Sequence, residues 1–228
     1  MLTIPEIRKI FLNKYKNSDF VIDKSGCKML ELVGHSFIAN QQTIFGKVSQ
    51  SYIKKELEWY LSQSLNVYDI PETPKIWQQV ATPKGLINSN YGFLIFSSDN
   101  HNQFMKAKHA LINDKTTRRA SMIYTRPSIQ SEYNKGGMSD FICTNAVNYF
   151  IRENKLNCVV QMRSNDIWAG YRNDYAWQKW VLDHLCENLK ETYPDLEPGD
   201  ILWNAASLHM YERNFGLIRK FEKTGLCI

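Results

Sequence analysis

The sequence lacks the features that mark membrane, secreted and zinc-binding proteins. No apolar run approaches the length that crosses a bilayer, and the first residues, MLTIPEIRKIF, show no signal-peptide pattern. Its five cysteines are an odd number without paired spacing, which excludes a CxxC zinc site and fits a reducing compartment. We therefore expect a cytoplasmic protein that binds no metal and no membrane.

The chain also lacks internal repeats, low-complexity tracts and linkers rich in proline or glycine, so residues 1–228 are predicted to form a single domain. Hydrophobic residues make up 43% of it, which favours a folded core over disorder. The net charge of +5 is mild, and basic doublets occur only at Lys54-Lys55 and Arg118-Arg119. A duplex-binding face would cluster basic residues more, so we expect a small phosphorylated ligand and no direct binding to nucleic acid. A nucleic-acid-binding protein is the alternative from another class.

The hydrophobic pattern predicts a mixture of helices and strands. Helices are predicted over residues 4–16, 51–63, 100–113, 174–189 and 215–222. Strands are predicted over 20–23, 28–33, 36–39, 120–124, 141–151, 157–162 and 201–211, and the apolar run at 91–96 suits one more buried strand. Because these elements do not alternate regularly, we expect an α/β (α+β) fold in which helices cover a mixed sheet.

Glu56 is a candidate acid on the predicted helix 51–63. Ile53, Leu57 and Tyr60 share the apolar face of this helix, and Glu58 projects opposite them. Glu56 lies on the apolar side of this predicted helix. Two interpretations are open: an edge residue whose carboxylate reaches water, or an acid held in a partly dry pocket for proton transfer. Spacing alone favours the first.

Cys143 is a candidate nucleophile, although a lone cysteine in a strand is usually a small hydrophobic residue. A nucleophilic cysteine needs nearby positive charge, which favours the thiolate over the thiol. Arg163, at the end of the next predicted strand, is placed to provide that charge. The other cysteines have no such neighbourhood in the sequence, so we expect them to be inert.

Several polar residues suit a nucleotide. Arg163-Ser164 and Arg118-Arg119 can clamp phosphate oxygens, although arginine pairs are also common on surfaces. His209 and Tyr211 alternate onto one face of a predicted strand, where they either meet a sugar hydroxyl or form ordinary half-buried hydrogen bonds. Asn173-Asp174 can simply cap the following helix, although the acid of a capping box is missing three residues later.

The order of these residues along the chain resembles that of one known family, the thymidylate synthases. The motifs that carry the resemblance are Glu56-Leu-Glu-Trp59, Ile76-Trp77, Asn90-Tyr-Gly92, Arg118-Arg119, Cys143, Arg163-Ser-Asn-Asp166, Gly170, Asp174 and His209-Met-Tyr211. Phrases such as ETPKIWQQVA, YNKGGMSDF and RNDYAWQK are most similar to the T-even phage branch of the family, which hydroxymethylates deoxycytidylate (dCMP). The resemblance covers about the whole chain. It implies a thymidylate synthase-like fold with a bent mixed sheet, in a homodimer packed sheet face to sheet face.

The resemblance also implies roles for individual residues. Cys143 matches the nucleophile, and Glu56 the acid that organises proton transfer and water. Lys24, Arg163 and Ser164 match phosphate ligands, and Arg118 and Arg119 match the pair that the other subunit contributes to the phosphate. His209 and Tyr211 match the contacts to the sugar 3′-hydroxyl. Asn165 and Asp174 match further substrate-binding positions. The positions that match the folate site are Trp77, Tyr91, Asp166 and Gly170. Two departures stand out: Lys24 replaces an arginine, and the sequence stops before the segment that closes over the folate in thymidylate synthases.

The implied chemistry is a one-carbon transfer to carbon 5 of a pyrimidine nucleotide. Addition of the Cys143 thiolate to carbon 6 makes carbon 5 a nucleophile toward the methylene of 5,10-methylenetetrahydrofolate, the one-carbon donor. Water, positioned by Glu56, then completes a hydroxymethyl group, whereas hydride from the folate completes a methyl group. The phage-like phrases favour the hydroxymethyl product, a precursor of modified phage DNA made in the host cytoplasm.

Position 174 bears on the choice of base. Thymidylate synthases carry Asn there, whose amide donates to oxygen 4 of uracil and accepts from its ring NH. Cytosine presents the opposite pattern, and Asp174 satisfies it when either the carboxyl or ring nitrogen 3 is protonated. The sequence therefore favours dCMP over dUMP. A dCMP methylase stays an alternative, and so does CMP as substrate, because His209 and Tyr211 address only the 3′-hydroxyl.

Overall fold

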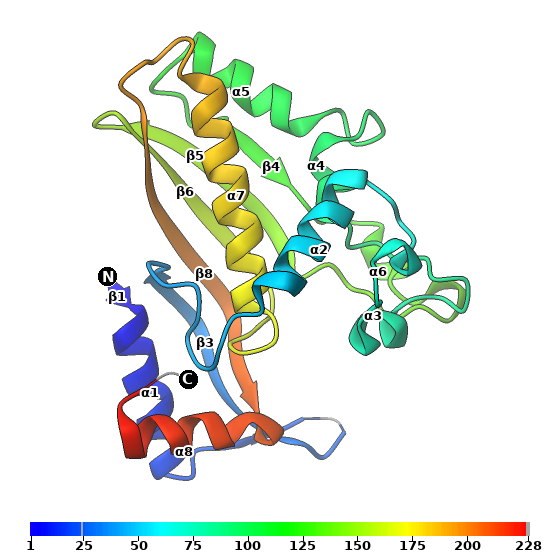
Figure 1. Ribbon diagram of the computed structural model, residues 1–228, viewed down its shortest axis with the longest axis vertical. Helices are drawn as coiled ribbons and strands as arrows, with labels where there is room; N and C mark the ends of the chain where they lie inside the picture. Colours follow the sequence, from blue (N-terminus) through cyan, green and yellow to red (C-terminus); the bar gives the residue numbers. More distant parts are fainter. Residues whose placement is uncertain (24, 227–228) are drawn as a thin grey trace.

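The protein folds around a mixed β-sheet, with α2, α5 and α7 lying in front of one face of that sheet (Figure 1). The structure is a computed structural model that describes residues 1–23 and 25–226. Its strands are β1 (Leu2–Thr3), β2 (Val21–Ile22), β3 (Lys28–Ile38), β4 (Ser121–Ile123), β5 (Thr144–Arg152), β6 (Lys155–Met162), β7 (Asn165–Asp166) and β8 (Glu197–Tyr211). Its helices are α1 (Ile4–Lys16), α2 (Gln50–Ser62), α3 (Lys75–Val80), α4 (Tyr91–Phe96), α5 (Gln103–Asn113), α6 (Ile129–Glu132), α7 (Tyr171–Leu189) and α8 (Phe215–Thr224), with short 3-10 turns at Val67–Asp69, Lys135–Gly137 and Glu212–Asn214.

The long strand β8 is the centre of the sheet. In the described residues the strands follow the order β1-β3-β8-β6-β5-β4, with β2 paired to β3 and β7 paired to β8. β8 runs antiparallel to β3, where Leu32 faces Leu208, and parallel to β6, where Val160 faces Trp203. The prediction of a mixed sheet covered by helices is confirmed.

The two faces of the sheet differ in burial. Val147, Tyr149 and Ile151 of β5 are buried, and the residues between them are only half-buried. This alternation has the period of two that a strand imposes on its side chains. The buried face packs under α7, which contacts β6 and β8. The other face carries half-buried and exposed side chains.

Local capping explains where several helices begin. α1 starts as predicted, because Thr3 caps it: its backbone N–H and its hydroxyl both donate to Glu6 Oε2 at 2.7 Å. α5 begins at Gln103, three residues later than predicted, because the Asn102 side chain accepts from Met105 N at its first turn.

The apolar run 91–96 is a short helix, α4, so the prediction of a strand there is wrong. The fully buried Asn90 explains the difference, because its Oδ1 accepts from Phe93 N at 2.8 Å and caps the helix. Its Nδ2 donates to two backbone carbonyls near the end of α2, which holds α4 against that helix. Gly92 permits this approach, since a Cβ there would lie 1.8 Å from the Tyr60 carbonyl oxygen.

α7 begins at Tyr171, three residues earlier than predicted. Gly170 occupies the N-cap position, and Asp174 lies inside the first turn of the helix. Asp174 is therefore not the cap, and the interpretation of Asn173-Asp174 as a simple helix cap is wrong. The predicted strands over 28–33 and 36–39 form one continuous strand, β3, with Gly34 at a positive φ of 68°.

One further observation concerns membranes. In the described ranges 1–23 and 25–226, none of the helices is both long enough and apolar enough to span a bilayer.

Candidate active site

A cavity of about 250 Å³ lies where α2, α3, α4 and the start of α7 meet the chain that leads into β5. Six of the predicted site residues line it, from five separate regions of the sequence: Glu56, Trp77, Tyr91, Cys143, Gly170 and Asp174. The same cavity is lined by eight residues that were not predicted to be site residues: Tyr52, Tyr60, Ile76, Val80, Ser89, Asp140, Ala169 and Asn173. The predicted nucleophile, acid and base-reading residue therefore meet in one place.

Glu56 is buried, with 5% of its surface exposed, so it is not an edge residue whose carboxylate reaches open water. The Tyr52 hydroxyl donates to Glu56 Oε1. The Trp77 indole N–H is shared between Glu56 Oε1, at 3.2 Å, and the Tyr52 oxygen, at 3.0 Å. Burial raises the pKa of Glu56, and the hydrogen bonds from Tyr52 and Trp77 oppose that rise. Glu56 is thus an acid in a dry pocket, with a pKa moved toward the range useful for proton transfer.

Cys143 lies directly before β5, and Arg163 lies directly after β6, its neighbour in the sheet. The predicted proximity is present: Arg163 Nη2 lies 3.7 Å from the Cys143 sulfur. Two backbone carbonyls hold the guanidinium there, Ile142 O at 2.9 Å from Nε and Phe141 O at 2.6 Å from Nη2.

Arg163 alone does not make Cys143 a thiolate. Burial raises the pKa of the Cys143 thiol to about 11, and the lowering by Arg163 only partly offsets this. The carboxyl groups of Asp174 and Asp140 raise the same pKa further. The thiol is therefore protonated at neutral pH, and its proton has to leave as the sulfur attacks.

Asp174 faces the cavity from the first turn of α7. Its Oδ2 accepts a hydrogen bond of 2.8 Å from the side-chain amide of Asn165, which is 3% exposed. Burial raises the pKa of Asp174 to about 8, the charge of Glu56 adds to the rise, and Asn165 opposes it. At neutral pH the carboxyl is therefore mostly protonated, and it can both donate and accept a hydrogen bond.

The turn that leads into α7 is held by Asp166. Its Oδ1 accepts from Trp168 N at 2.8 Å and from Ala169 N at 2.9 Å. Gly170 follows in this turn, and a Cβ on it would lie only 3.3 Å from Asp174 Oδ2. Asp166 and Gly170 therefore shape the rim of the cavity beside Asp174.

His209 lies next to Asp166, because β7 pairs with β8 at these two residues. Its ring packs edge-on against Tyr211 at 5.3 Å between centroids, and its Nδ1 lies 3.2 Å from Ser207 Oγ. Burial lowers the pKa of His209, so the imidazole is neutral at neutral pH and can donate or accept. The predicted placement of His209 and Tyr211 on one strand is confirmed.

Other predicted ligands lie away from this cavity. Arg118 and Arg119 line a separate hollow of about 470 Å³ near the end of α5. Ser164 is half-buried in the segment between β6 and β7. Lys24, the third predicted phosphate ligand, lies outside the described residues.

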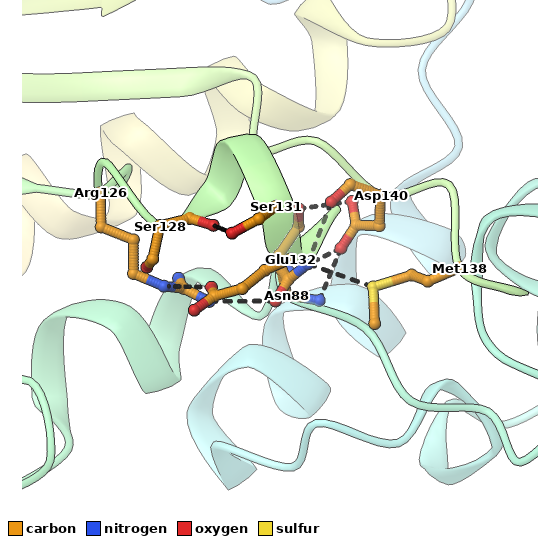
Figure 2. A network of polar contacts seen from close by, with 8 residues as sticks. Asn88, Arg126, Ser128, Ser131, Glu132, Met138 and Asp140 are labelled. Carbon is orange, nitrogen blue, oxygen red and sulfur yellow. Dashed lines mark hydrogen bonds and ion pairs between the residues drawn. The ribbon is translucent and has the colours of Figure 1, made fainter. Parts of the chain in front are cut away.

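The most connected of the residues missed in the sequence is Asp140, three positions before Cys143 (Figure 2). Its Oδ2 accepts from the backbone N–H groups of Asn88 and Ser89 at 2.7 and 2.8 Å, and its Oδ1 accepts from Ser89 Oγ at 2.6 Å. Arg126 extends this network, since it donates to Asn88 Oδ1 at 3.0 Å and pairs with Glu132 at 2.6 Å. The network joins the segment before Cys143 to the segment before α4, so it fixes one wall of the cavity.

Two of the missed residues left a signal in the sequence. Tyr52 precedes Glu56 by one helical turn and therefore shares its face. Asp140 is a charged residue within an apolar segment beside the candidate nucleophile. The hydrogen bonds from Asn165 to Asp174 and from Trp77 to Glu56 join different elements and left no such local signal.

No cluster of three or more metal-ligating side chains occurs in residues 1–23 and 25–226. The lining instead combines aromatic and aliphatic surfaces, from Trp77, Ile76 and Val80, with the two buried acids Glu56 and Asp174. Such a lining suits flat heteroaromatic rings that carry a few polar atoms.

Comparisons with known proteins agree with the resemblance seen in the sequence. A family model described as thymidylate synthase matches residues 8–223. The deoxycytidylate 5-hydroxymethyltransferases of Enterobacteria phages T6 and T4 are each 53% identical over 227 residues, covering 98% of this chain and 92% of the relative. Thymidylate synthase of Francisella philomiragia is 23% identical over 208 residues, covering 84% of this chain and 74% of that protein.

A solved structure supports the fold. The crystal structure of thymidylate synthase from phage T4 superposes with a TM-score of 0.73, covering 96% of this chain and 79% of that chain. The sequences of the two are 19% identical, so this likeness concerns the fold. The predicted fold class is confirmed.

Proposed function

The chain belongs to the thymidylate synthase family, and we propose that it is a folate-dependent transferase that converts dCMP to 5-hydroxymethyl-dCMP. The observation that carries this proposal is the meeting of Cys143, Glu56 and Asp174 in one cavity, with Asp174 mostly protonated. The names of the phage relatives, which span nearly the whole chain, support the same activity.

Asp174 would read the cytosine ring. In its protonated form the carboxyl can donate to ring nitrogen 3 and accept from the amino group at position 4, which matches both polar atoms of that edge. Uracil presents an NH and a carbonyl oxygen there instead, so its pattern is reversed. Asn165 supports this role, because its amide holds Asp174 Oδ2 in place.

Cys143 would attack carbon 6 of the bound cytosine. The sulfur lies in the same cavity as Asp174, and the Arg163 guanidinium at 3.7 Å favours the charge that develops on it. Because the resting thiol is protonated, its proton would pass to a water molecule in the cavity as the bond to carbon 6 forms. Carbon 5 then carries the electron density of an enamine and can accept a one-carbon unit.

The one-carbon unit would come from 5,10-methylenetetrahydrofolate, which the family uses as donor. The aromatic and aliphatic side of the cavity, lined by Trp77, Ile76 and Tyr91, suits its pterin ring, and Gly170 lines the same cavity. When bound, the folate supplies an electrophilic methylene group to carbon 5. The chain's own residues orient the two rings and exclude bulk water, since Glu56 and Tyr91 are both at most 5% exposed.

Water would complete the product. Once carbon 5 has gained the methylene carbon, it would lose its proton to water and tetrahydrofolate would leave from that carbon, so the cytosine would carry an exocyclic methylene group. A water molecule adds to that carbon and gives a proton to Glu56, the ring double bond between carbons 5 and 6 re-forms, and Cys143 leaves as thiolate. Glu56 suits this step because it is a buried acid on the wall of the cavity that holds the nucleophile.

Phosphate and sugar would bind at the edge of the site. Arg163 and Ser164 are the phosphate ligands of this subunit, and Lys24 is a further proposed ligand outside the described residues. His209 and Tyr211, at the end of β8, would bind the 3′-hydroxyl of the sugar.

We propose that the protein is a homodimer that shares its sites. Arg118 and Arg119 line a hollow of their own and not the cavity of Cys143, as expected if each pair serves the neighbouring site. Arg118 and Arg119 of the partner subunit would then complete the phosphate site. The half-exposed face of the sheet, opposite α7, supplies the surface on which a second subunit packs.

The test of base reading is the substitution Asp174→Asn. A buried donor or acceptor left without its partner costs about 1–3 kcal/mol, so two reversed bonds change the preference by roughly 10- to 10⁴-fold. We expect the ratio of kcat/KM for dCMP over dUMP to fall by that factor. Asp183→Asn is the matched control, because Asp183 lies on the same helix and pairs with Lys179 at its surface. An unchanged ratio in Asp174→Asn would contradict the assignment of cytosine.

A further inference from the structure

We propose that Tyr52 is a positioning residue for the hydroxymethylation step: its hydroxyl fixes the Glu56 carboxylate so that one oxygen is held by the protein and the other is offered to the attacking water. This inference rests on the proposed function, because it concerns how that function's last step is directed. It assigns a role to a residue that touches neither the nucleophile nor the residue that reads the base.

The geometry around Glu56 is asymmetric. Oε1 accepts from both the Tyr52 hydroxyl and the Trp77 indole N–H. Within residues 1–23 and 25–226, Oε2 accepts no hydrogen bond from the protein. Glu56 lines the cavity that also contains Cys143 and Asp174, so the oxygen without a protein donor is the one available to a molecule bound there.

Tyr52 and Trp77 form a closed set of hydrogen bonds with Glu56 Oε1. The single hydroxyl hydrogen of Tyr52 is used toward Glu56, and its oxygen accepts from the Trp77 N–H at 3.0 Å. Both side chains are anchored by different helices, α2 and α3, so the carboxylate is held from two directions. Rotation of Glu56 would break the hydrogen bonds from both.

The same contact controls the charge on Glu56. The ionisable groups around this carboxylate are Tyr52 and Tyr60 on its own helix and Arg172 and Asp174 on α7. Burial raises the pKa of Glu56, and the hydrogen bond from Tyr52 is the largest influence that lowers it. Burial and the nearby Glu56 charge raise the pKa of Tyr52 well above its usual value, so Tyr52 stays a donor throughout the neutral range. Tyr52 therefore lowers the pKa of Glu56 relative to what burial alone would give, and so favours the ionised form that can accept a proton.

The chemical consequence concerns one step. Water attacks the exocyclic methylene carbon, its proton passes to the free Glu56 oxygen, the electron pair of the exocyclic double bond re-forms the ring double bond, and the Cys143 sulfur departs with its bonding pair. Without the Tyr52 hydroxyl, Glu56 is more protonated and, among the described residues, is held only by the Trp77 indole N–H. The earlier steps, which use Cys143 and Asp174, do not require the Tyr52 hydroxyl.

The experiment compares wild type with Tyr52→Phe, which removes the hydroxyl and keeps the ring. Tyr68→Phe is the matched control, because Tyr68 is 54% exposed and does not line the cavity. Release of tritium from carbon 5 of labelled dCMP reports the steps before water capture. The yield of 5-hydroxymethyl-dCMP measures how much of the methylene intermediate is captured by water. The yield of the thioether formed with added 2-mercaptoethanol measures how much of the intermediate water does not capture.

We expect Tyr52→Phe to release tritium within about threefold of the wild-type rate while it forms hydroxymethyl product roughly 10- to 100-fold more slowly and accumulates the thioether. The acid limb of its kcat profile should move up by about one pH unit or more, because a hydrogen bond to a charged group is lost from Glu56. Tyr68→Phe should match wild type in every readout.

Two results would overturn the proposal, provided that thermal unfolding shows an intact fold. One is a Tyr52→Phe variant that divides the methylene intermediate between hydroxymethyl product and thioether as wild type does, and whose kcat profile has the wild-type acid limb. The other is an equal loss of tritium release and product, which would place the hydroxyl in an earlier step or in general packing. Failure of the proposed function is seen separately, because wild type itself would then form no hydroxymethyl product.

Discussion

Replacing Asp174 by asparagine should remove a loss of folding stability that the protein otherwise suffers as pH rises from about 4 to about 8. Burial raises the pKa of Asp174 from an ordinary 3.8 to about 8. An acid whose pKa is raised by folding holds its proton more tightly in the folded state, so stability falls as pH rises from the ordinary value to the folded value. Between pH 6 and pH 8 the slope falls from about 1.4 to about 0.7 kcal/mol per pH unit, which amounts to roughly 2 kcal/mol.

Asparagine has nearly the same shape as aspartate but does not ionise, so this contribution should be absent in Asp174→Asn. Urea unfolding of both proteins at pH 6, 7, 8 and 9 measures the effect directly. We expect the difference in unfolding free energy to grow in favour of the variant by about 2–4 kcal/mol across this range, with most of the change before pH 8. Groups that titrate with folding but do not interact with Asp174, such as Asp140, contribute equally to both proteins and cancel. A difference that is independent of pH would show that Asp174 is not a protonated buried acid, and the reasoning about its burial would be refuted.

Two further predictions concern the nucleophile and the dimer. Cys143→Ala should fold and bind nucleotide but form no product, measured as turnover of dCMP, and substantial product from this variant would exclude covalent catalysis. Arg119→Ala should also be inactive, yet mixing the two inactive variants should restore part of the activity, because some heterodimers then contain one site with both wild-type residues. No recovery, with subunit exchange confirmed by mass spectrometry, would mean that Arg119 does not act across subunits.

Local patterns in the sequence predicted much of the architecture. The periodicity of α1 and the core of α7, and the alternation in β5, β6 and β8, depend on neighbours along the chain and appear correctly in the structure. The adjacency of β5 and β6 also placed Arg163 beside Cys143, because both residues lie at the same end of one hairpin.

The secondary-structure predictions were wrong where contacts between residues distant in the sequence determine the local structure. The run 91–96 has the composition of a buried strand, and it is helical because Asn90 caps it and ties it to α2. α7 begins earlier than predicted because Asp166 accepts hydrogen bonds from the backbone N–H groups of Trp168 and Ala169 and so fixes the turn before the helix. Neither set of contacts can be read from hydrophobic periodicity.

The protonation states of the site residues could not be predicted from the sequence either. The raised pKa values of Asp174 and Cys143 come first from burial, which depends on how α2, α4 and α7 close around the cavity. The sequence suggested that Arg163 would favour the thiolate, and the structure shows that burial outweighs that effect. For Asp174, burial raises the pKa and keeps the carboxyl protonated, and a protonated carboxyl matches both polar atoms of cytosine.

The central claim, that this site adds water to a methylene group on cytosine, is tested most directly by the mass of the product. Purified protein is incubated with dCMP and 5,10-methylenetetrahydrofolate in water enriched in ¹⁸O, and the nucleotide is analysed by mass spectrometry while absorbance reports any dihydrofolate. We predict a gain of CH₂O in which the added oxygen carries the label, with no dihydrofolate formed. A gain of CH₂ alone, with dihydrofolate in equal amount, would contradict the account and identify a methylase.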